Sequence, residues 1–388
     1  MKNVRMFSIF LGLLVVSCLL VSCFSSENPS AQRAKRARRA QGPIVIGAAS
    51  PWSETHSFLE QGIKLAVAEV NASGGVLGRN LEVIFADDKA TVSTGQLVAQ
   101  QFADNPDMVA VIGHTNSYIS IPVSIIYEYY GLLMLSPLST SPRFTERKFK
   151  LVFRNIPDDV AYGLEMAHLC KKRHLKRAII YHIDNEYGTG LANAFENECR
   201  TTDVDIVDRA SYDSVSGMKV FKFQLEFWQR NYEFDTLFLA AEMPDAAEIV
   251  VYARKLGINA TIIGGDYFDN LGFIKSAGEA AEGVIVPSVF QPDNPLPSVV
   301  SFVKNFKKKY GQTPGYAAEQ GYDAVKVLVQ AIEAVKTTEP LKVAEIMRSG
   351  KEWRGVIDDY SFNDKGNVEG RKIFFKVVKN GDFVLLSD

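Results

Sequence analysis

The sequence predicts an α/β fold with two doubly wound domains, on the evidence of its length, its apolar content and a repeated strand–helix pattern. The chain has 388 residues, 47% of them hydrophobic, which suffices for two or three domains with buried cores. Short apolar segments alternate with amphipathic helical segments from residue 44 onward. This alternation is typical of parallel sheets covered by helices on both faces, and it runs in two blocks, so we expect two similar domains.

Each predicted element rests on apolar spacing and on the residues that end it. Strand 44–48 is a short apolar run, and Leu59, Ile63 and Val70 then recur at helical spacing before the turn 71–75. The first block continues with strands 81–86, 109–113 and 132–135 and helices 93–104 and 117–130. The second block has helices 158–173, 188–201, 217–231 and 244–257 and strands 178–182, 204–212, 236–240 and 261–264.

Residues 1–22 have the pattern of a secretory signal peptide. Lys2 and Arg5 precede an apolar run, 6–21, that is shorter than the roughly 20 residues a membrane-spanning helix needs. The run ends in Leu20-Val21-Ser22-Cys23, which resembles the bacterial lipobox, so we expect Cys23 to be lipidated. An uncleaved signal anchor is the alternative. Both interpretations predict a periplasmic or extracytoplasmic protein attached to a bacterial membrane.

Residues 23–41 have no hydrophobic period and are rich in Ser, Ala and Arg, which predicts a disordered basic tether outside the fold. The basic run from Arg33 to Arg39 fits either contact with anionic lipid or a solvated linker. Residues 1–41 hold seven of the 43 basic side chains and one of the 45 acidic ones, which leaves 36 against 44, or −8, on the rest. This acidic body argues against a nucleic-acid partner, because Lys and Arg contacts to phosphates supply most of that affinity.

Two cysteines, Cys170 and Cys199, remain besides Cys23 once Cys18 has left with the signal peptide. Each lies near the end of a predicted helix at the same pole of a sheet. Export permits disulfides, so the two side chains form either a disulfide or a pair of buried free thiols. His168 and His174 lie on either side of Cys170 in the sequence. We expect no metal site there, because residues at i, i+2 and i+6 point in different directions around a helix.

Candidate binding residues follow the strands, since ligands of parallel α/β sheets lie beyond the carboxyl ends of the strands. In the first block these loops are rich in hydroxyls and amides, and in the second in carboxylates and aromatic rings. The loops are 50–56, 113–118 and 136–142 in the first block and 184–188, 241–244 and 265–269 in the second. The contrast predicts a ligand with a negative end toward the first domain and a positive or apolar end toward the second.

Motifs of enzymes are absent from the sequence. It has no Gly-x-Ser-x-Gly elbow, no His-Glu-x-x-His, no Gly-x-x-x-x-Gly-Lys loop and no Gly-x-Gly-x-x-Gly after the first strand. The adjacent acids Asp87-Asp88 and Asp358-Asp359 point opposite ways in extended chain. We therefore expect neither catalysis nor a cofactor.

Several short segments occur in the order and spacing of one known family. They include Tyr187-Gly188-Thr189-Gly190 and the segments 62–66, 71–78, 87–88, 111–114, 131–137, 281–283 and 362–366. Through them the chain from about residue 44 onward resembles the bacterial periplasmic leucine/isoleucine/valine-binding proteins. The resemblance implies a type I periplasmic binding fold, two doubly wound lobes joined by a hinge of three crossovers near 153–157, 284–292 and 354–360. The first lobe would hold residues 42–154 and 291–354 and the second 155–290 and 355–388, and a monomer suits closure of the hinge.

The resemblance also implies roles for individual residues. Ser117 and Thr140, with the backbone at Leu138 and Ser139, fall where the family binds the ligand α-carboxylate. Hydroxyl and amide donors hold an ionised carboxylate without a counter-charge. Asp266 falls where an acidic residue pairs with the α-ammonium, and Tyr187 where an aromatic ring closes over the ligand. A helix cap at Ser117 is compatible with that role, and packing of Tyr187 against Gly188 is the alternative to its role.

Two positions depart from the family pattern. Glu242 stands where the branched-chain binders have an aromatic residue, and Thr55 or His56 stands where an aromatic residue lines the side-chain pocket. A buried carboxylate without a partner is costly beside an aliphatic group, so the side chain of the ligand stays open. Trp52 either supplies the missing aromatic face or lies on the surface at the lobe edge.

These features predict a solute-binding lipoprotein of an ABC importer, with an amino acid of branched-chain or related type as ligand and a membrane permease with its ATPase subunits as partners. Two alternatives stay open. One is a receptor that reports the ligand to a membrane kinase or chemoreceptor. The other keeps transport but has an amide, a urea or an organic acid as ligand.

Overall fold

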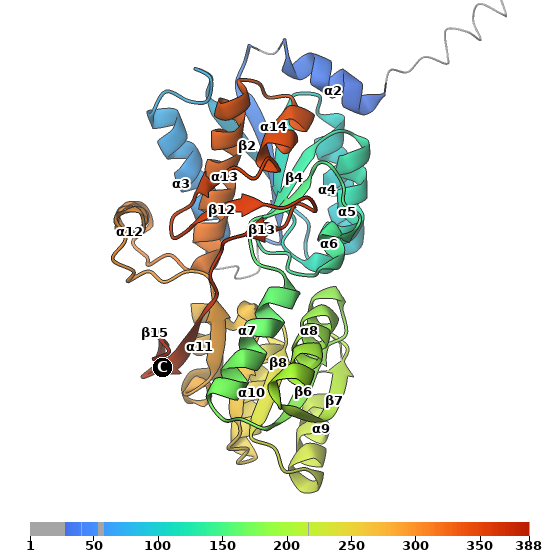
Figure 1. Cartoon of the computed structure of the whole chain (residues 1–388), viewed down its shortest axis with the longest axis vertical. Coiled ribbons are helices and arrows are strands. Elements are labelled where there is room, and N and C mark those ends of the chain that lie inside the picture. The colour runs from blue at the N-terminus through green and yellow to red at the C-terminus, as the bar shows by residue number, and fades with distance from the viewer. Residues whose placement is uncertain (1–27, 40, 53–57, 216, 388) are drawn as a thin grey trace, which may run out of the picture.

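The computed structural model describes residues 28–39, 41–52, 58–215 and 217–387, which form two α/β lobes stacked along the long axis of the molecule (Figure 1). The first lobe has a five-stranded parallel sheet in the order β2-β1-β3-β4-β5. Its strands are β1 (Ile44–Ser50), β2 (Leu81–Asp87), β3 (Met108–Gly113), β4 (Leu133–Ser136) and β5 (Val152–Arg154). The helices that follow them are α3 (Leu59–Ala72), α4 (Val92–Asp104), α5 (Ser117–Tyr129) and α6 (Arg143–Glu146).

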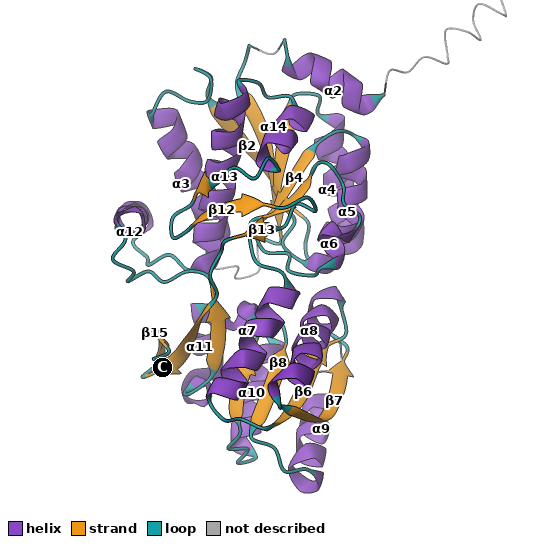
Figure 2. Cartoon of the chain, in the orientation of Figure 1, coloured by secondary structure: helices purple, strands orange, loops and turns teal. Residues whose placement is uncertain are grey.

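The second lobe has a seven-stranded sheet in the order β15-β14-β10-β9-β8-β6-β7. Five strands are parallel, and β14 and β15 are antiparallel additions at one edge. The strands are β6 (Arg177–Ile183), β7 (Asp205–Tyr212), β8 (Thr236–Ala240), β9 (Thr261–Gly264), β10 (Ile285–Ser288), β14 (Phe374–Lys379) and β15 (Asp382–Leu385). The helices are α7 (Asp159–Lys172), α8 (Glu186–Thr202), α9 (Met218–Asn231), α10 (Asp245–Lys255), η1 (Asp266–Phe268), α11 (Leu271–Ala277) and η2 (Gly278–Ala281). The predicted α/β fold with parallel sheets is confirmed (Figure 2).

Part of the chain returns to the first lobe after β10. It forms α12 (Pro297–Tyr310), α13 (Tyr316–Val335) and α14 (Pro340–Met347), followed by the small sheet of β11 (Trp353–Arg354), β12 (Asp359–Phe362) and β13 (Val368–Glu369). Helix α13 packs closely on α3, where a Cβ atom on Gly62 would lie 1.9 Å from the carbonyl oxygen of Ala318. Only glycine permits this approach, so Gly62 fixes how the returning helix meets the first sheet.

Three crossovers connect the lobes, and the third differs from the prediction. The first two lie between β5 and α7 and between β10 and α12. The third was expected near 354–360, but β12 and β13 pack on the first lobe, and the chain crosses only between β13 and β14. The N–H of Arg154 donates to the carbonyl of Gly366 at 2.9 Å, and the Phe153 and Phe362 ring centroids are 5.3 Å apart. These long-range contacts hold residues 353–369 in the first lobe.

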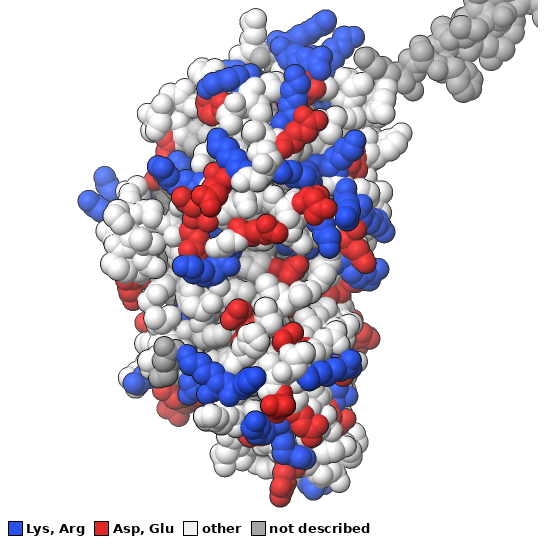
Figure 3. All heavy atoms as spheres, in the orientation of Figure 1, with Lys and Arg blue, Asp and Glu red and all other residues white. Residues whose placement is uncertain are grey.

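The prediction of a disordered tether is wrong for residues 28–39. They form helix α2 (Pro29–Ala37), which lies on the first lobe at the end of the molecule away from the second lobe (Figure 1). Lys and Arg side chains gather at this end (Figure 3). Ala, Gln and Arg favour helix, and the docking uses polar contacts that hydrophobic spacing does not register. The predicted signal peptide and Cys23 lie outside the described residues.

Cys170 and Cys199 are both buried free thiols, so the disulfide alternative does not hold in this structure. Burial raises the pKa of the Cys170 thiol to about 12. Burial also raises the pKa of the Cys199 thiol, and the neighbouring Cys170 adds to that shift. Both thiols therefore stay protonated at neutral pH and pack as small apolar side chains in the core between α7 and α8.

Candidate ligand-binding site

One small pocket lies where the two lobes meet. Its walls lie close together and leave only about 10 Å³ that a water molecule can reach. Its walls are Thr115, Asn116, Ser117, Leu138 and Tyr316 from the first lobe and Tyr187, Glu242, Asp266 and Tyr267 from the second. All of these except Tyr316 belong to loops or helix starts that follow a strand, which is where the sequence predicted a site.

On the first lobe, Ser117 is the first residue of α5, and it is buried. Its Oγ accepts a hydrogen bond of 3.2 Å from the backbone N–H of Ser141, so the loop after β4 and the start of α5 are held together. A helix N-terminus has free N–H groups and a partial positive charge. This wall therefore suits a carboxylate.

A buried histidine holds the two loops of this wall in place. The carbonyl of His114 accepts hydrogen bonds from the hydroxyls of Ser120, Ser136 and Ser139 at 3.0, 2.6 and 3.3 Å. Its ring Nδ1 lies 2.6 Å from Oδ2 of Asp88, and all these side chains are buried. The wall is rigid because each loop is tied to the same carbonyl.

Thr140 and Ser139 lie behind this wall rather than in it. The N–H of Ser139 donates to Oγ of Ser136 at 3.1 Å, so it already has a partner inside the lobe. The hydroxyl of Thr140 is buried, and it acts on the carboxyl of Asp159, where burial raises the pKa and this hydroxyl lowers it. Of the four residues expected to hold a carboxylate, the structure places Ser117 and Leu138 in the pocket wall and Ser139 and Thr140 outside it.

Asp159, which the sequence analysis missed, approaches Thr140 from the first crossover. Its backbone N–H donates to the carbonyl of Thr140 at 2.9 Å. Burial raises the pKa of its carboxyl well above the usual range, and the charge of Asp266 raises it further. A Cβ atom on Gly190 would lie 2.5 Å from Oδ2 of Asp159, so this glycine makes room for the carboxyl. An Asp next to a helix start is common as a cap, and that signal alone does not reveal a place between the lobes.

Asp266 forms the acidic part of the second-lobe wall. It follows β9, it is 4% exposed, and its Oδ1 has no hydrogen-bond partner among the described residues. Burial raises the pKa of its carboxyl to about 7, Asp269 adds to the shift, and the Tyr187 hydroxyl and nearby backbone N–H groups oppose it. The described residues that line the pocket include no Lys or Arg, so a ligand cation would be the charge partner of Asp266.

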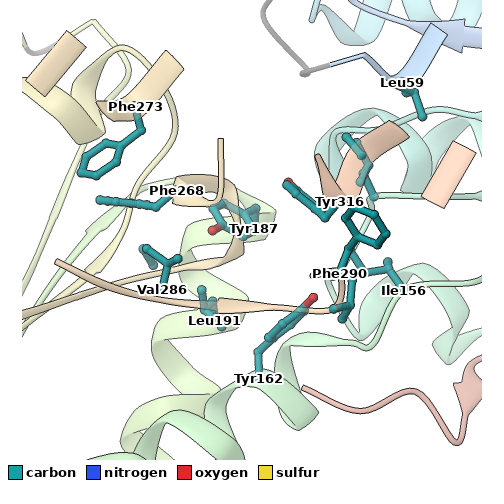
Figure 4. Close-up of a cluster of buried hydrophobic side chains, with 14 of the residues drawn as sticks. Leu59, Ile156, Tyr162, Tyr187, Leu191, Phe268, Phe273, Val286, Phe290 and Tyr316 are labelled. Atoms are coloured by element: carbon teal, nitrogen blue, oxygen red, sulfur yellow. The ribbon is translucent and has the colours of Figure 1, made fainter. Parts of the chain in front are cut away.

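Aromatic rings close the pocket from both lobes. Tyr187 in α8 and Tyr316 at the start of α13 both line it, and Figure 4 shows them beside each other where the lobes meet. The ring centroids of Tyr187 and Tyr267 are 6.1 Å apart. A Cβ atom on Gly265 would lie 2.3 Å from the Tyr187 hydroxyl, so glycine there lets this hydroxyl reach the backbone beside Asp266. Tyr316 was missed because a helix far along the chain brings it.

Glu242 lies at the pocket after β8, as one of the departures from the family pattern. Its Oε1 accepts a hydrogen bond of 3.2 Å from Nδ2 of Asn185. The Oδ1 atom of Asn185 accepts from the N–H of Gly188 at 2.9 Å as the N-cap of α8. The carboxylate is thus held by a side chain that is itself fixed.

Trp52 does not line the pocket. Trp52 is half-buried against β2, where its Nε1–H donates to the carbonyl of Ala86 at 2.9 Å and its ring centroid lies 5.3 Å from that of Phe85. It therefore does not supply the missing aromatic face, and the lobe-edge alternative fits better. Thr55 and His56 lie outside the described residues. Within the described ranges, no group of three His, Cys, Asp or Glu side chains is arranged to hold a metal ion.

The lobes are in contact beside the pocket. Arg143 of α6 in the first lobe forms an ion pair with Glu186 of α8 in the second. This ion pair and the hydrogen bond from Asp159 to Thr140 connect the two lobes and hold the two walls of the pocket face to face.

Comparison with known proteins identifies the family. A family model for periplasmic binding proteins matches residues 43–382. The chain belongs to the periplasmic binding protein family. It is 29% identical over 338 residues to the Leu/Ile/Val-binding protein homolog 2 of Brucella abortus, covering 84% of this chain and 87% of that protein. The resemblance seen in the sequence is thus confirmed, and the family consists of substrate-binding proteins of transport systems, not enzymes.

Solved structures agree with the type I periplasmic binding fold of this binding protein. An ABC transporter substrate-binding protein from Desulfitobacterium hafniense in complex with Leu has a TM-score of 0.80 and 38% identity, covering 89% of this chain and 100% of that one. A leucine-binding protein from Thermotoga maritima has a TM-score of 0.81 and 26% identity, covering 89% and 98%. No helix in the described part of the binding protein has the length and apolar character needed to cross a membrane.

Proposed function

We propose that this protein is an extracytoplasmic lipoprotein of an ABC importer that binds an α-amino acid, of branched-chain or related type, between its lobes. The observation that carries the proposal is the pairing of Ser117 and Asp266 across one pocket. Ser117 brings the N-terminus of α5 to the pocket. Asp266 brings a buried carboxyl that has no basic neighbour in the pocket lining. These two ends complement the carboxylate and the ammonium of one zwitterion. The names of the relatives, which bind leucine, isoleucine or valine, support the same ligand class.

Binding in this proposal proceeds by hinge closure. The ligand carboxylate first meets the start of α5, with Ser117 and the backbone N–H groups of that helix start as donors. Closure then brings Asp266, Tyr187 and Glu242 over the ligand and excludes water, which strengthens the charge pairing. The closed form docks on the permease, and acylated Cys23 keeps the protein at the membrane.

The test is a thermal-shift and calorimetric screen of the purified protein against the twenty amino acids and a panel of amides, ureas and organic acids. A ligand that binds the folded state raises the melting temperature by mass action. Shifts confined to α-amino acids support the proposal, and shifts confined to compounds without an ammonium group contradict it. Loss of uptake in a deletion strain would separate transport from a receptor role.

A further inference from the structure

Arg33 fastens helix α2 to the end of the first lobe. This side chain is only 5% exposed. Its guanidinium donates to the carbonyls of Ala103, Asn105 and Met108 at 2.6, 2.8 and 2.5 Å, and to that of Tyr130 at 3.1 Å. Three of these carbonyls lie at the C-terminal ends of α4 and α5, where a cation is stabilised by the partial negative charge of the helix ends. A buried arginine with this many acceptors is a built attachment point.

Two further arginines extend the attachment across the lobe. Arg36 forms a two-pronged ion pair with Asp107 at 2.5 and 2.8 Å, and Arg38 forms one with Glu339 at 2.8 and 2.9 Å. The hydroxyl of Thr338 also donates to the carbonyl of Ala37 at 3.2 Å. The segment is therefore fixed along its length, from the region before β3 to the start of α14.

The surface around α2, here called the basic pole, carries charge opposite to the rest of the molecule. Lys35, Arg36, Arg38 and Arg39 are exposed, and Lys342 joins them from α14 through Glu339. Figure 3 shows Lys and Arg side chains gathered at this end. The chain from residue 42 onward has an excess of acidic residues, so positive and negative charge are unevenly distributed over the molecule. Such a distribution orients a protein on an anionic surface.

The basic pole also lies where the N-terminal segment arrives. It is at the end of the long axis opposite the second lobe (Figure 1). Cys23 precedes Asn28, the N-cap of α2, by five residues. At ~3.6 Å per residue this chain spans at most ~18 Å, so a lipid on Cys23 would hold the pole near the bilayer.

We propose that the basic pole is a docking surface for anionic lipid headgroups, and that helix α2 connects this surface to the membrane anchor. The proposal rests on the lipid anchor of the proposed function. It gives the molecule one orientation on the membrane, with the first lobe near the bilayer and the second lobe outward and free to close.

The test measures orientation by energy transfer from a dye on the protein to an acceptor in the lipid headgroups. The full chain is reconstituted through its own anchor in vesicles of phosphatidylcholine, with or without phosphatidylglycerol. The dye is placed by Glu345→Cys on α14 or by Lys222→Cys on α9, both exposed positions. Cys170 and Cys199 are buried and do not compete for the dye. We expect strong transfer from position 345 and weak transfer from position 222 in the anionic vesicles.

Three variants connect this difference to the basic pole. Lys35→Glu with Arg39→Glu should reduce the ratio of binding to anionic over neutral vesicles, by roughly fivefold for each positive charge removed. The reason is that each basic residue near an anionic membrane surface contributes about 1 kcal/mol to binding. Lys304→Glu with Lys308→Glu on α12 makes the same charge change elsewhere and should leave the difference intact. Arg33→Ala should release α2 from the first lobe, so that energy transfer from positions 345 and 222 becomes equal. If that variant does not fold, the charge-reversal pair decides.

Equal transfer from both positions in the wild-type chain, or an unchanged difference in the Lys35→Glu, Arg39→Glu variant, overturns the proposal. Failure of the chain to attach to any vesicle overturns both this proposal and the anchor. Calorimetry with amino acids on the same preparation measures ligand binding separately. A failed membrane test can therefore be distinguished from a wrong ligand class.

Discussion

The side-chain amide of Asn185 joins the start of α8 to the pocket carboxylate of Glu242. Its Oδ1 caps the helix at the N–H of Gly188, and its Nδ2 donates to Oε1 of Glu242 at 3.2 Å. The same side chain thereby sets the position of a charge that purely aliphatic ligands do not match. We therefore propose that Glu242 sets the selectivity of the pocket.

Glu242→Gln is expected to raise the affinity for leucine and to lower it for amino acids with a hydrogen-bond donor on the side chain. The change keeps the size and removes the charge, and a hydrogen bond to a charged group contributes about 1.5–3 kcal/mol. Calorimetric titration with both ligand types measures the difference. Glu279→Gln, at an exposed position on η2, is the control. Unchanged selectivity would mean that Glu242 does not face the ligand side chain.

Asp266→Asn is expected to abolish measurable binding of α-amino acids. It removes the charge that pairs with the ammonium and costs about 2–5 kcal/mol of binding free energy. Isothermal calorimetry gives the affinity, with Asp364→Asn at an exposed ion pair as the control. An affinity equal to that of the wild type would refute the ammonium role.

Amino-acid binding is expected to weaken as the pH falls below about 7. Burial raises the pKa of Asp266 to about 7 without ligand, and a bound ammonium favours the charged carboxyl and lowers this pKa. The binding free energy is therefore complete above the ligand-free pKa. It is lost as the pH drops toward the pKa of the complex, by at most about tenfold in affinity per pH unit. Calorimetry at about pH 6, in buffers of different ionisation enthalpy, should detect proton release, and a flat affinity from about pH 5 to 8 would contradict it.

Arg371→Met is expected to destabilise the protein by about 3–5 kcal/mol. Arg371 lies on the third crossover and pairs with Glu319 at 2.8 Å and Asp323 at 2.5 Å on α13, with all three side chains buried. Its loss leaves buried carboxyls without a counter-charge. Urea unfolding monitored by circular dichroism measures the change. Lys336→Met breaks the exposed pair with Glu333 and should cost less than about 1 kcal/mol, so equal losses would argue against the buried triad.

The strand-end rule found the loops of the pocket because it is local, and the family resemblance singled out the residues within them. Ser117, Leu138, Tyr187, Glu242 and Asp266 all follow strands whose apolar runs are visible, and all five line the pocket. Tyr316 and Asp159 escaped because neither follows a strand of its own lobe directly. Their position depends on a returning helix and on a crossover.

Long-range contacts explain the two errors in the fold. Helix α2 is held by Arg33 on backbone carbonyls, and the segment 353–369 by contacts such as that of Arg154 with Gly366. The backbone carbonyls that hold Arg33 leave no pattern in the sequence, because every residue carries such a group. The apolar side chains of a short strand such as β12 do not indicate which lobe they pack against.

The sequence by itself determined the order and type of the elements, because side-chain periodicity reports which face of a helix or strand is buried. Only the tertiary structure decided which remote groups meet: Asp266 facing the start of α5, Asn185 holding Glu242, and Arg33 at the ends of two helices. Those meetings are set by how the lobes and returning segments pack. Packing depends on distances between residues that no local pattern encodes.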